Sequence, residues 1–191
     1  ADYRGGPFDA MNQPSAAGLT TAIDDGVAVV EHVAALPYVD PGRVNVYGVS
    51  LGGNLALFLA AQVPTLHAVV VGAPAPFWFL GARLPERAED ALEAPAEADA
   101  AIAAANVEPI STPILIQVGT LDPLLDIDRV LHRELSAHGK EVRMEIYAHG
   151  YHDFVLGPQG HNRPDLPQGE ILLEATLDAL ERSVEFVKTG R

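Results

Sequence analysis

Short runs of β-branched and other apolar residues alternate with longer segments in which apolar residues recur every three or four positions. The first pattern is typical of buried strands and the second of amphipathic helices. Their alternation predicts an α/β domain with a mostly parallel sheet and helices on both faces. We expect strands over 44–47, 68–72, 114–118 and 141–147, and helices over 19–36, 54–62, 128–138 and 170–188.

Residues 73–111 interrupt this alternation. The segment opens with Pro-Ala-Pro-Phe-Trp-Phe-Leu at 74–80 and then becomes rich in alanine and glutamate. We interpret it as a short helical lid inserted above the carboxyl ends of the strands, with a single surface helix and loops as the alternative. The acidic residues of 86–99 are expected to form a solvated helical face. The whole chain, 1–191, reads as a single domain with this lid as an insertion over about 73–111.

Composition narrows the possible functions. The chain has 191 residues, 48% of them hydrophobic, and a formal net charge of −14. The charge argues against nucleic acid or an anionic membrane as a partner. No apolar run approaches the roughly 18 residues needed to span a bilayer. We expect a soluble protein, cytoplasmic rather than secreted, although the absence of cysteine leaves the redox compartment open.

The stretch Gly48-Val49-Ser50-Leu51-Gly52-Gly53 joins an expected strand to an expected helix. This is the pattern of a nucleophile elbow, a sharp turn that presents a serine hydroxyl in a strained backbone conformation. We expect Gly48 and Gly52 to be required because larger side chains two positions from Ser50 would collide with the strand and the helix. The backbone N–H of Leu51 is then placed to stabilise an oxyanion. An ordinary glycine-rich turn is the alternative.

A serine nucleophile needs an imidazole to take its proton and a carboxylate to orient the imidazole. Asp122 and His152 follow two further expected strands, and the order Ser50, Asp122, His152 is that of α/β-hydrolases. Asp122 has an alternative role as a turn residue before Pro123, while Asp126 and Asp128 are better placed to cap the next helix.

His149 competes with His152 as the base, but its position next to the strand end suits a turn. A metal site formed by His149, His152 and Asp153 has weak support from the spacing. We therefore expect no metal and no other cofactor. The aromatic residues Phe77, Trp78 and Phe79 are candidates for an apolar substrate wall, with core packing as the alternative.

Several further motifs accompany these residues: Tyr3-Arg4-Gly5, Asp24-Asp25, Leu36-Pro37-Tyr38-Val39-Asp40-Pro41-Gly42-Arg43-Val44, Thr112-Pro113-Ile114, Gly119-x-x-Asp122 and His152-Asp153-Phe154. Together with the elbow, they resemble the α/β-hydrolase branch that contains dienelactone hydrolases and the catalytic domains of prolyl-oligopeptidase-like enzymes. The resemblance implies Ser50 as nucleophile, Asp122 as acid, His152 as base and Leu51 N–H as an oxyanion donor. A dienelactone hydrolase proper carries a cysteine nucleophile, which this chain lacks.

The same resemblance implies a missing part of the sheet. The family sheet has eight strands, and the Tyr-Arg-Gly loop follows the fourth, so the N-terminal half of the sheet is expected to be absent from this sequence. The second oxyanion N–H would come from that half. We expect the missing strands to be supplied by a longer parent chain, a second chain or, less favourably, a homodimer, because the elbow strand would otherwise expose an unpaired edge.

The sequence is compatible with three functions. The first is a serine hydrolase that cleaves a small-molecule carboxylic ester through an acyl-enzyme. The second is a peptidase of the prolyl-oligopeptidase-like type that acts on short peptides, although no propeller or terminus-gripping charges are visible. The third is a non-catalytic module that keeps the α/β-hydrolase fold without a complete oxyanion hole.

Overall fold

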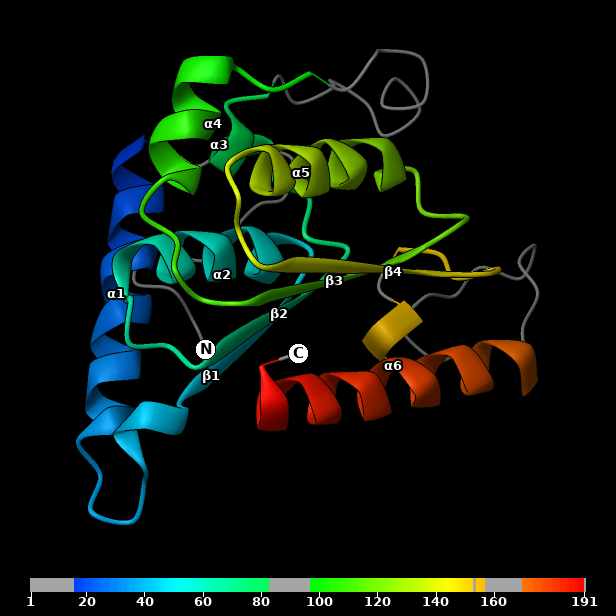
Figure 1. Cartoon of the computed structure of the whole chain (residues 1–191). Coiled ribbons are helices and arrows are strands. Elements are labelled where there is room, and N and C mark those ends of the chain that lie inside the picture. Colours follow the sequence, from blue (N-terminus) through cyan, green and yellow to red (C-terminus); the bar gives the residue numbers. More distant parts are fainter. Residues whose placement is uncertain (1–15, 83–96, 153, 157–169, 191) are drawn as a thin grey trace.

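A computed structural model describes residues 16–82, 97–152, 154–156 and 170–190. Within them, four parallel strands form one sheet in the order β1-β2-β3-β4 (Figure 1). The strands are β1 (Asn45–Val49), β2 (Ala68–Gly72), β3 (Ile114–Gly119) and β4 (Val142–Tyr147). Val49 pairs with Gly72 and Gly119 pairs with Tyr147, so the carboxyl ends of the strands lie along one edge of the sheet. Ligands of such sheets bind outside this edge.

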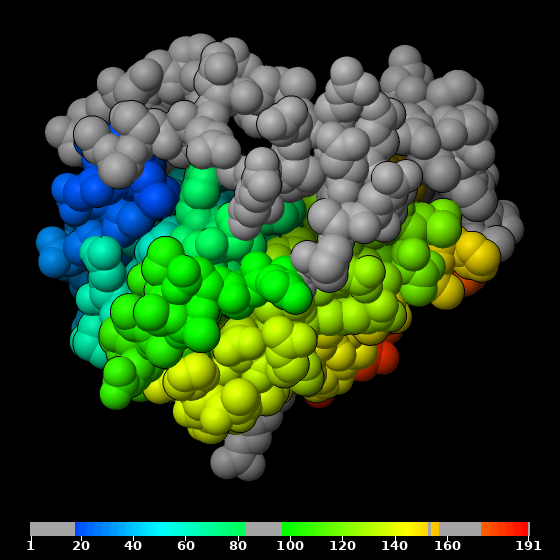
Figure 2. Space-filling view, turned by 90° about the horizontal axis from the view of Figure 1, so that it is seen from above, coloured from blue at the N-terminus to red at the C-terminus, as the bar shows by residue number. Residues whose placement is uncertain are grey.

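Helices cover both faces, as expected from the sequence (Figure 1). On one face lie α1 (Ala16–Ala34), α2 (Leu51–Gln62), α3 (Phe77–Leu80), α4 (Ala100–Val107) and α5 (Leu125–Ala137), and on the other lies α6 (Glu170–Thr189). The described connecting segments also contain the short 3₁₀ helices η1 (Pro41–Arg43) and η3 (Phe154–Leu156). Figure 2, viewed from above, shows the green residues of α4 packed beside the yellow-green residues of α5.

The observed strands and helices agree closely with the periodicity of the sequence. The run Ala68–Gly72 is buried at every position, as its uninterrupted apolar character predicts for a strand covered on both faces. Helix α2 is buried continuously from Gly53 to Ala60 because it lies against β1 and β2 on one side and against α1 and α3 on the other. None of the described helices is both long and apolar enough to cross a membrane.

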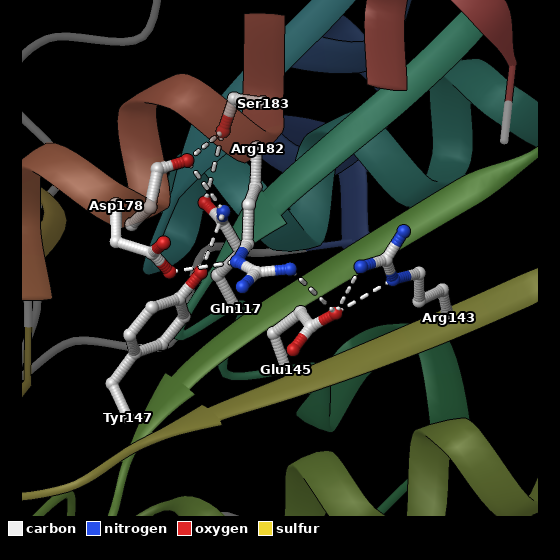
Figure 3. Close-up of polar contacts among 8 residues, drawn as sticks. Gln117, Arg143, Glu145, Tyr147, Asp178, Arg182 and Ser183 are labelled. Atoms are coloured by element: carbon white, nitrogen blue, oxygen red, sulfur yellow. Dashed lines mark hydrogen bonds and ion pairs between the residues drawn. The ribbon is translucent and has the colours of Figure 1, made fainter. Parts of the chain in front are cut away.

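Polar contacts hold α6 against the sheet (Figure 3). The buried Gln117 of β3 donates a 2.7 Å hydrogen bond to the Ala179 carbonyl and accepts one of 3.1 Å from Ser183. At the side nearer β4, Arg182 forms a 2.7 Å ion pair with Asp178 and lies 3.9 Å from Glu145. Of these groups Gln117 and Ser183 are buried, and buried polar groups that are paired in this way specify one docking position for a helix.

The described parts of the expected lid pack into the main core. Phe79 and Leu80 of α3 and Ala103 and Val107 of α4 are buried together with residues of α2 and α5. Asp99 caps α4 by accepting hydrogen bonds from two backbone N–H groups of its first turn. Residues 83–96, which carry most of the acidic cluster, lie outside the described part of the chain. The lid interpretation therefore stays a prediction for that segment.

Candidate active site

The turn after β1 has the geometry of a nucleophile elbow. Ser50 has φ 53° and ψ −121°, a strained backbone conformation for a residue with a side chain. Two hydrogen bonds hold it there: its N–H donates to the Gly72 carbonyl at 2.9 Å, and its carbonyl accepts the N–H of Asn54 at 3.0 Å. A Cβ at Gly48 would lie 2.2 Å from the Gly52 carbonyl oxygen. The steric expectation for Gly48 is thus confirmed.

The expectation for Gly52 is wrong. A Cβ at Gly52 would meet no atom of the described residues outside its own helix backbone within 4 Å. The position that needs glycine is the next one, because a Cβ at Gly53 would lie 2.7 Å from the Cα of Pro74. The closest obstacle at this position comes from the segment after β2, and the Gly48 carbonyl oxygen of the elbow strand adds a tight contact at 3.3 Å.

Two glycines bring the loops after β3 and β4 into backbone contact. A Cβ at Gly119 would lie 2.0 Å from the Gly150 carbonyl oxygen. That oxygen accepts the N–H of Leu121 at 2.7 Å, while the N–H of Thr120 donates to the Tyr147 carbonyl at 2.9 Å. The loop that contains Asp122 and the loop that contains His152 are therefore fastened together through their main chains.

These loops place three polar side chains in one hydrogen-bonded row. The Nε2 atom of His152 lies 2.8 Å from Ser50 Oγ, and Nδ1 lies 3.0 Å from Asp122 Oδ2. Asp122 is buried, and its other oxygen accepts the N–H of Leu124 at 2.8 Å. In the tautomer protonated at Nδ1, His152 donates to Asp122 and accepts the Ser50 hydroxyl. The structure thus unites the three residues selected from the sequence, and Asp122 also stabilises its own turn.

His149 lies apart from this row. Its φ is 62°, its side chain is exposed, and its N–H donates to Thr120 Oγ1 at 2.9 Å. It closes the turn after β4, the role that its position next to the strand end suggested. Asp153, the third member of the weak metal hypothesis, lies outside the described residues.

The helix after Asp122 begins earlier than the sequence suggested. It starts at Leu125, with Leu124 at the N-cap, so Asp126 and Asp128 lie within the first turn instead of capping it. Asp126 is exposed and pairs with Arg129 at 2.9 Å, whereas Asp128 is fully buried. Sequence reasoning missed this buried carboxyl. The order of polar and apolar residues around Asp128 is the same as around an exposed residue of an amphipathic helix, so it gives no sign of burial.

The three aromatic candidates occupy different environments. Phe79 is fully buried and packs edge-on against Phe58 with ring centroids 5.2 Å apart, so it belongs to the core. Phe77 is buried as well, while Trp78 is partly exposed and packs against the same core.

Leu51, the expected oxyanion donor, is the first residue of α2, where a backbone N–H has no acceptor within the helix.

The comparisons with known proteins agree with this architecture. The family model of the dienelactone hydrolase family matches residues 6–190. An esterase of Pyrobaculum calidifontis superposes with a TM-score of 0.65 and 19% identity, covering 93% of this chain and 62% of that one. A dienelactone hydrolase-like promiscuous phosphotriesterase from metagenomic libraries gives 0.62 and 20%, with 88% and 61% covered.

The structure of a peptidase is similar to this chain to a comparable degree. Dipeptidyl peptidase 4 of Porphyromonas gingivalis gives a TM-score of 0.59 and 18% identity, covering 88% of this chain and 22% of that one. At such identities the likeness establishes the fold alone. This chain spans about three fifths of the esterase and of the phosphotriesterase. Because the family model extends over nearly all 191 residues, the chain belongs to the dienelactone hydrolase family of the α/β-hydrolase superfamily.

Proposed function

We propose that the chain is a serine hydrolase that cleaves carboxylic esters through an acyl-enzyme. The observation that carries the proposal is the continuous row from Asp122 Oδ2 through His152 to Ser50 Oγ, with links of 3.0 and 2.8 Å. Both distances lie within the range that proton transfer by a general base requires. The strained elbow gives further support, since strain of this kind is retained where a nucleophile must be exposed.

In the proposed reaction, Ser50 Oγ attacks the ester carbonyl carbon while its proton moves to Nε2 of His152. Asp122 accepts a hydrogen bond from Nδ1–H and stabilises the imidazolium that forms. The carbonyl oxygen becomes an oxyanion that accepts the N–H of Leu51, at the positive end of the α2 dipole. The alcohol leaves with the proton from His152, and a water molecule then releases the acid by the same steps.

The acyl or alcohol group of the substrate is proposed to lie against the side chains that follow β2. Trp78 is the strongest candidate of the three aromatic residues because it alone combines partial exposure with anchoring in the core. Phe77 contributes the buried support of that wall. Phe79 supports the position of the segment from within the core.

We also propose that additional polypeptide, from a longer parent chain or a second chain, covers the open side of this sheet. Within the described residues β1 has β2 as its only strand neighbour. Helix α6 exposes a stripe of apolar residues that we call the α6 stripe: Leu173, Leu177, Leu180 and Val184, which are 44–51% exposed. Their spacing of four, three and four residues places them on one flank of the helix.

That flank is the one nearer β1. Asp178 and Arg182 occupy the opposite flank, where Arg182 lies 3.9 Å from Glu145 of β4. Tyr47 of β1 is also 44% exposed. A strand added beside β1, followed by a helix packed along the α6 stripe, would cover both features. A second copy of this chain is a weaker candidate because each copy carries a net charge of −14.

The proposed hydrolase activity is tested with a fluorophosphonate probe, which reacts only with an activated serine. We expect labelling of the wild-type chain and none of Ser50→Ala, with Ser15 and Ser111 intact as controls for nonspecific reaction. Equal labelling of both proteins would refute the assignment of Ser50.

Turnover of a short-chain nitrophenyl ester, compared with turnover of a peptide anilide, then separates an esterase from a peptidase. A folded chain that the probe does not label would indicate a non-catalytic module.

A further inference from the structure

The carboxyl group of Asp128 is buried although it takes no part in the row of Ser50, His152 and Asp122. Asp128 is 0% exposed, and neither of its oxygens has a hydrogen-bond partner within the described residues. The other carboxylate of the same helical turn, Asp126, is at the surface beside Arg129. Burial of an ionised carboxylate without a partner is strongly unfavourable. The protonated form of the Asp128 carboxyl is therefore favoured in the folded chain.

One residue, Leu124, connects the backbone of Asp128 to the candidate catalytic acid. The N–H of Leu124 donates to Asp122 Oδ1 at 2.8 Å, and the carbonyl of Leu124 accepts the N–H of Asp128 at 3.1 Å. The negative charge of Asp122 acts on the carboxyl of Asp128. A displacement of Asp128 would therefore be transmitted to Asp122 through the backbone of Leu124.

On its other side, Asp128 faces the segment between β2 and α3. The backbone amide of Ala75 acts on its carboxyl and favours the charged form, without reaching hydrogen-bond geometry. Ala75 has φ 46° and its carbonyl accepts the N–H of Phe77 at 2.8 Å. Asp128 thus lies between the loop of Asp122 and the segment that leads to the proposed substrate wall.

Within the part of the chain that the structure describes, the elements around Asp128 offer it no compensating cation. Residues 73–76, α2, α3, α4 and β3 contain no ionisable side chain. On α5 itself, Arg129 is engaged with Asp126 at the surface and Arg133 with Glu134. His132 is the remaining ionisable residue of this helix. The ionisable residues of β4 lie on the face covered by α6. There Tyr147 contacts Gln117, and Glu145 contacts both Arg143 and Arg182.

We propose that Asp128 is a positioning residue that stays protonated at neutral pH, fills the contact between α5 and residues 73–76, and leaves Asp122 as the one carboxylate beside His152. Of the two carboxyls, Asp122 receives hydrogen bonds from Leu124 and His152, and Asp128 receives none within the described residues. The negative charge therefore resides on Asp122 and the proton on Asp128. Burial, and secondly the charge of Asp122, raises the pKa of Asp128 well above its ordinary value.

Because Asp128 is protonated in the folded chain, the free energy of unfolding depends on pH. In the unfolded chain Asp128 ionises near its ordinary pKa of about 3.9, whereas in the folded chain it keeps its proton to higher pH. The folded state therefore binds more protons between these two pKa values, and its stability falls as pH rises through that window. The substitution Asp128→Asn keeps the size and hydrogen-bonding capacity of a neutral group and removes the titration.

The first experiment compares thermal unfolding of wild type, D128N and the matched control D126N between about pH 4 and pH 8. We expect the Tm of D128N relative to wild type to rise with pH by at least about 3 °C over this range, which corresponds to a pKa displaced by about one pH unit or more. The D126N difference is expected to stay constant, because Asp126 is exposed. A constant difference for D128N as well would overturn the proposal.

A second measurement uses infrared spectroscopy and does not depend on the variant folding or on any activity. Wild type at neutral pH is expected to show the carbonyl-stretch band of a protonated carboxylic acid, which disappears at alkaline pH. The absence of this band at neutral pH would overturn the proposal. Because this readout involves no substrate, it also distinguishes failure of this proposal from failure of the proposed ester hydrolysis.

The third measurement rests on the proposed function and follows kcat and KM for a short-chain nitrophenyl ester as pH rises. Ionisation of Asp128 requires water to enter between α5 and residues 73–76, which displaces the Leu124 peptide and Asp122. We expect kcat of wild type to fall on the alkaline side, D128N to lose that fall, and D126N to behave as wild type. Superimposable kcat profiles for wild type and D128N would overturn a role in positioning.

Discussion

Replacing Gly48 by alanine tests the packing of the elbow more sharply than any change to the serine itself. The new Cβ would lie 2.2 Å from the Gly52 carbonyl oxygen and 2.8 Å from the Gly53 nitrogen. Carbon–oxygen contacts normally begin at about 3.3 Å, so the turn must open by about 1 Å. Because both obstacles are backbone atoms, no rotamer change relieves the contact.

The expected cost follows from the size of this overlap. Overpacking destabilises by about 1–3 kcal/mol, which lowers Tm by roughly 2–12 °C for a chain of this size. A displacement of Ser50 by about 1 Å would also slow reaction with the fluorophosphonate probe about 100-fold. Differential scanning calorimetry measures the first effect, and the time course of labelling measures the second.

Gly52→Ala is the matched control. It adds the same methyl group four residues away, where no atom of the described residues outside the helix backbone lies within 4 Å. Since alanine favours the helix over glycine by up to about 1 kcal/mol, we expect Tm to stay constant or to rise by a few degrees. If G48A were as stable as G52A and labelled at the wild-type rate, the steric account of the elbow would be refuted.

Three further predictions follow. His152→Ala should abolish fluorophosphonate labelling while His149→Ala retains most of it, because His149 contacts Thr120 and not Ser50; comparable losses would contradict the assignment. Asp122→Asn should slow labelling by about 10³–10⁴-fold, since His152 loses the acceptor that sets its tautomer, and unchanged kinetics would refute that role. Gln117→Leu should destabilise the fold by about 1–3 kcal/mol in chemical denaturation, because the two hydrogen bonds of Gln117, to the Ala179 carbonyl and from Ser183, are lost while Ser183 keeps its own bond to the Ala179 carbonyl. An unaltered midpoint would show that α6 docks without this contact.

The proposed cover of β1 and the α6 stripe predicts how the isolated chain behaves. Sedimentation velocity and binding of a hydrophobic dye should reveal association or exposed apolar surface, because contiguous apolar patches and open strand edges are rare in stable monomers. A stable monomer that binds no dye would contradict the need for additional polypeptide.

Much of the architecture can be predicted from the sequence, because the residues that determine each strand, helix and turn lie next to one another in the chain. The apolar run 68–72 predicts a fully buried strand, and β2 spans those residues. The elbow is equally local, since strand, turn and helix are contiguous from β1 through Ser50 to α2. The residues after β3 and β4 were candidates because parallel strands bring their carboxyl ends to one edge.

What the sequence determined by itself is the set of strands and helices and the short list of polar residues at the strand ends, because periodicity and glycine spacing act over a few neighbouring positions. The tertiary structure decided which members of that list meet. Ser50 and His152 are 102 positions apart, the glycine requirement falls on Gly53 because Pro74 packs there, and Asp128 is buried instead of capping α5. Each of these outcomes depends on contact between distant segments, which no local pattern encodes.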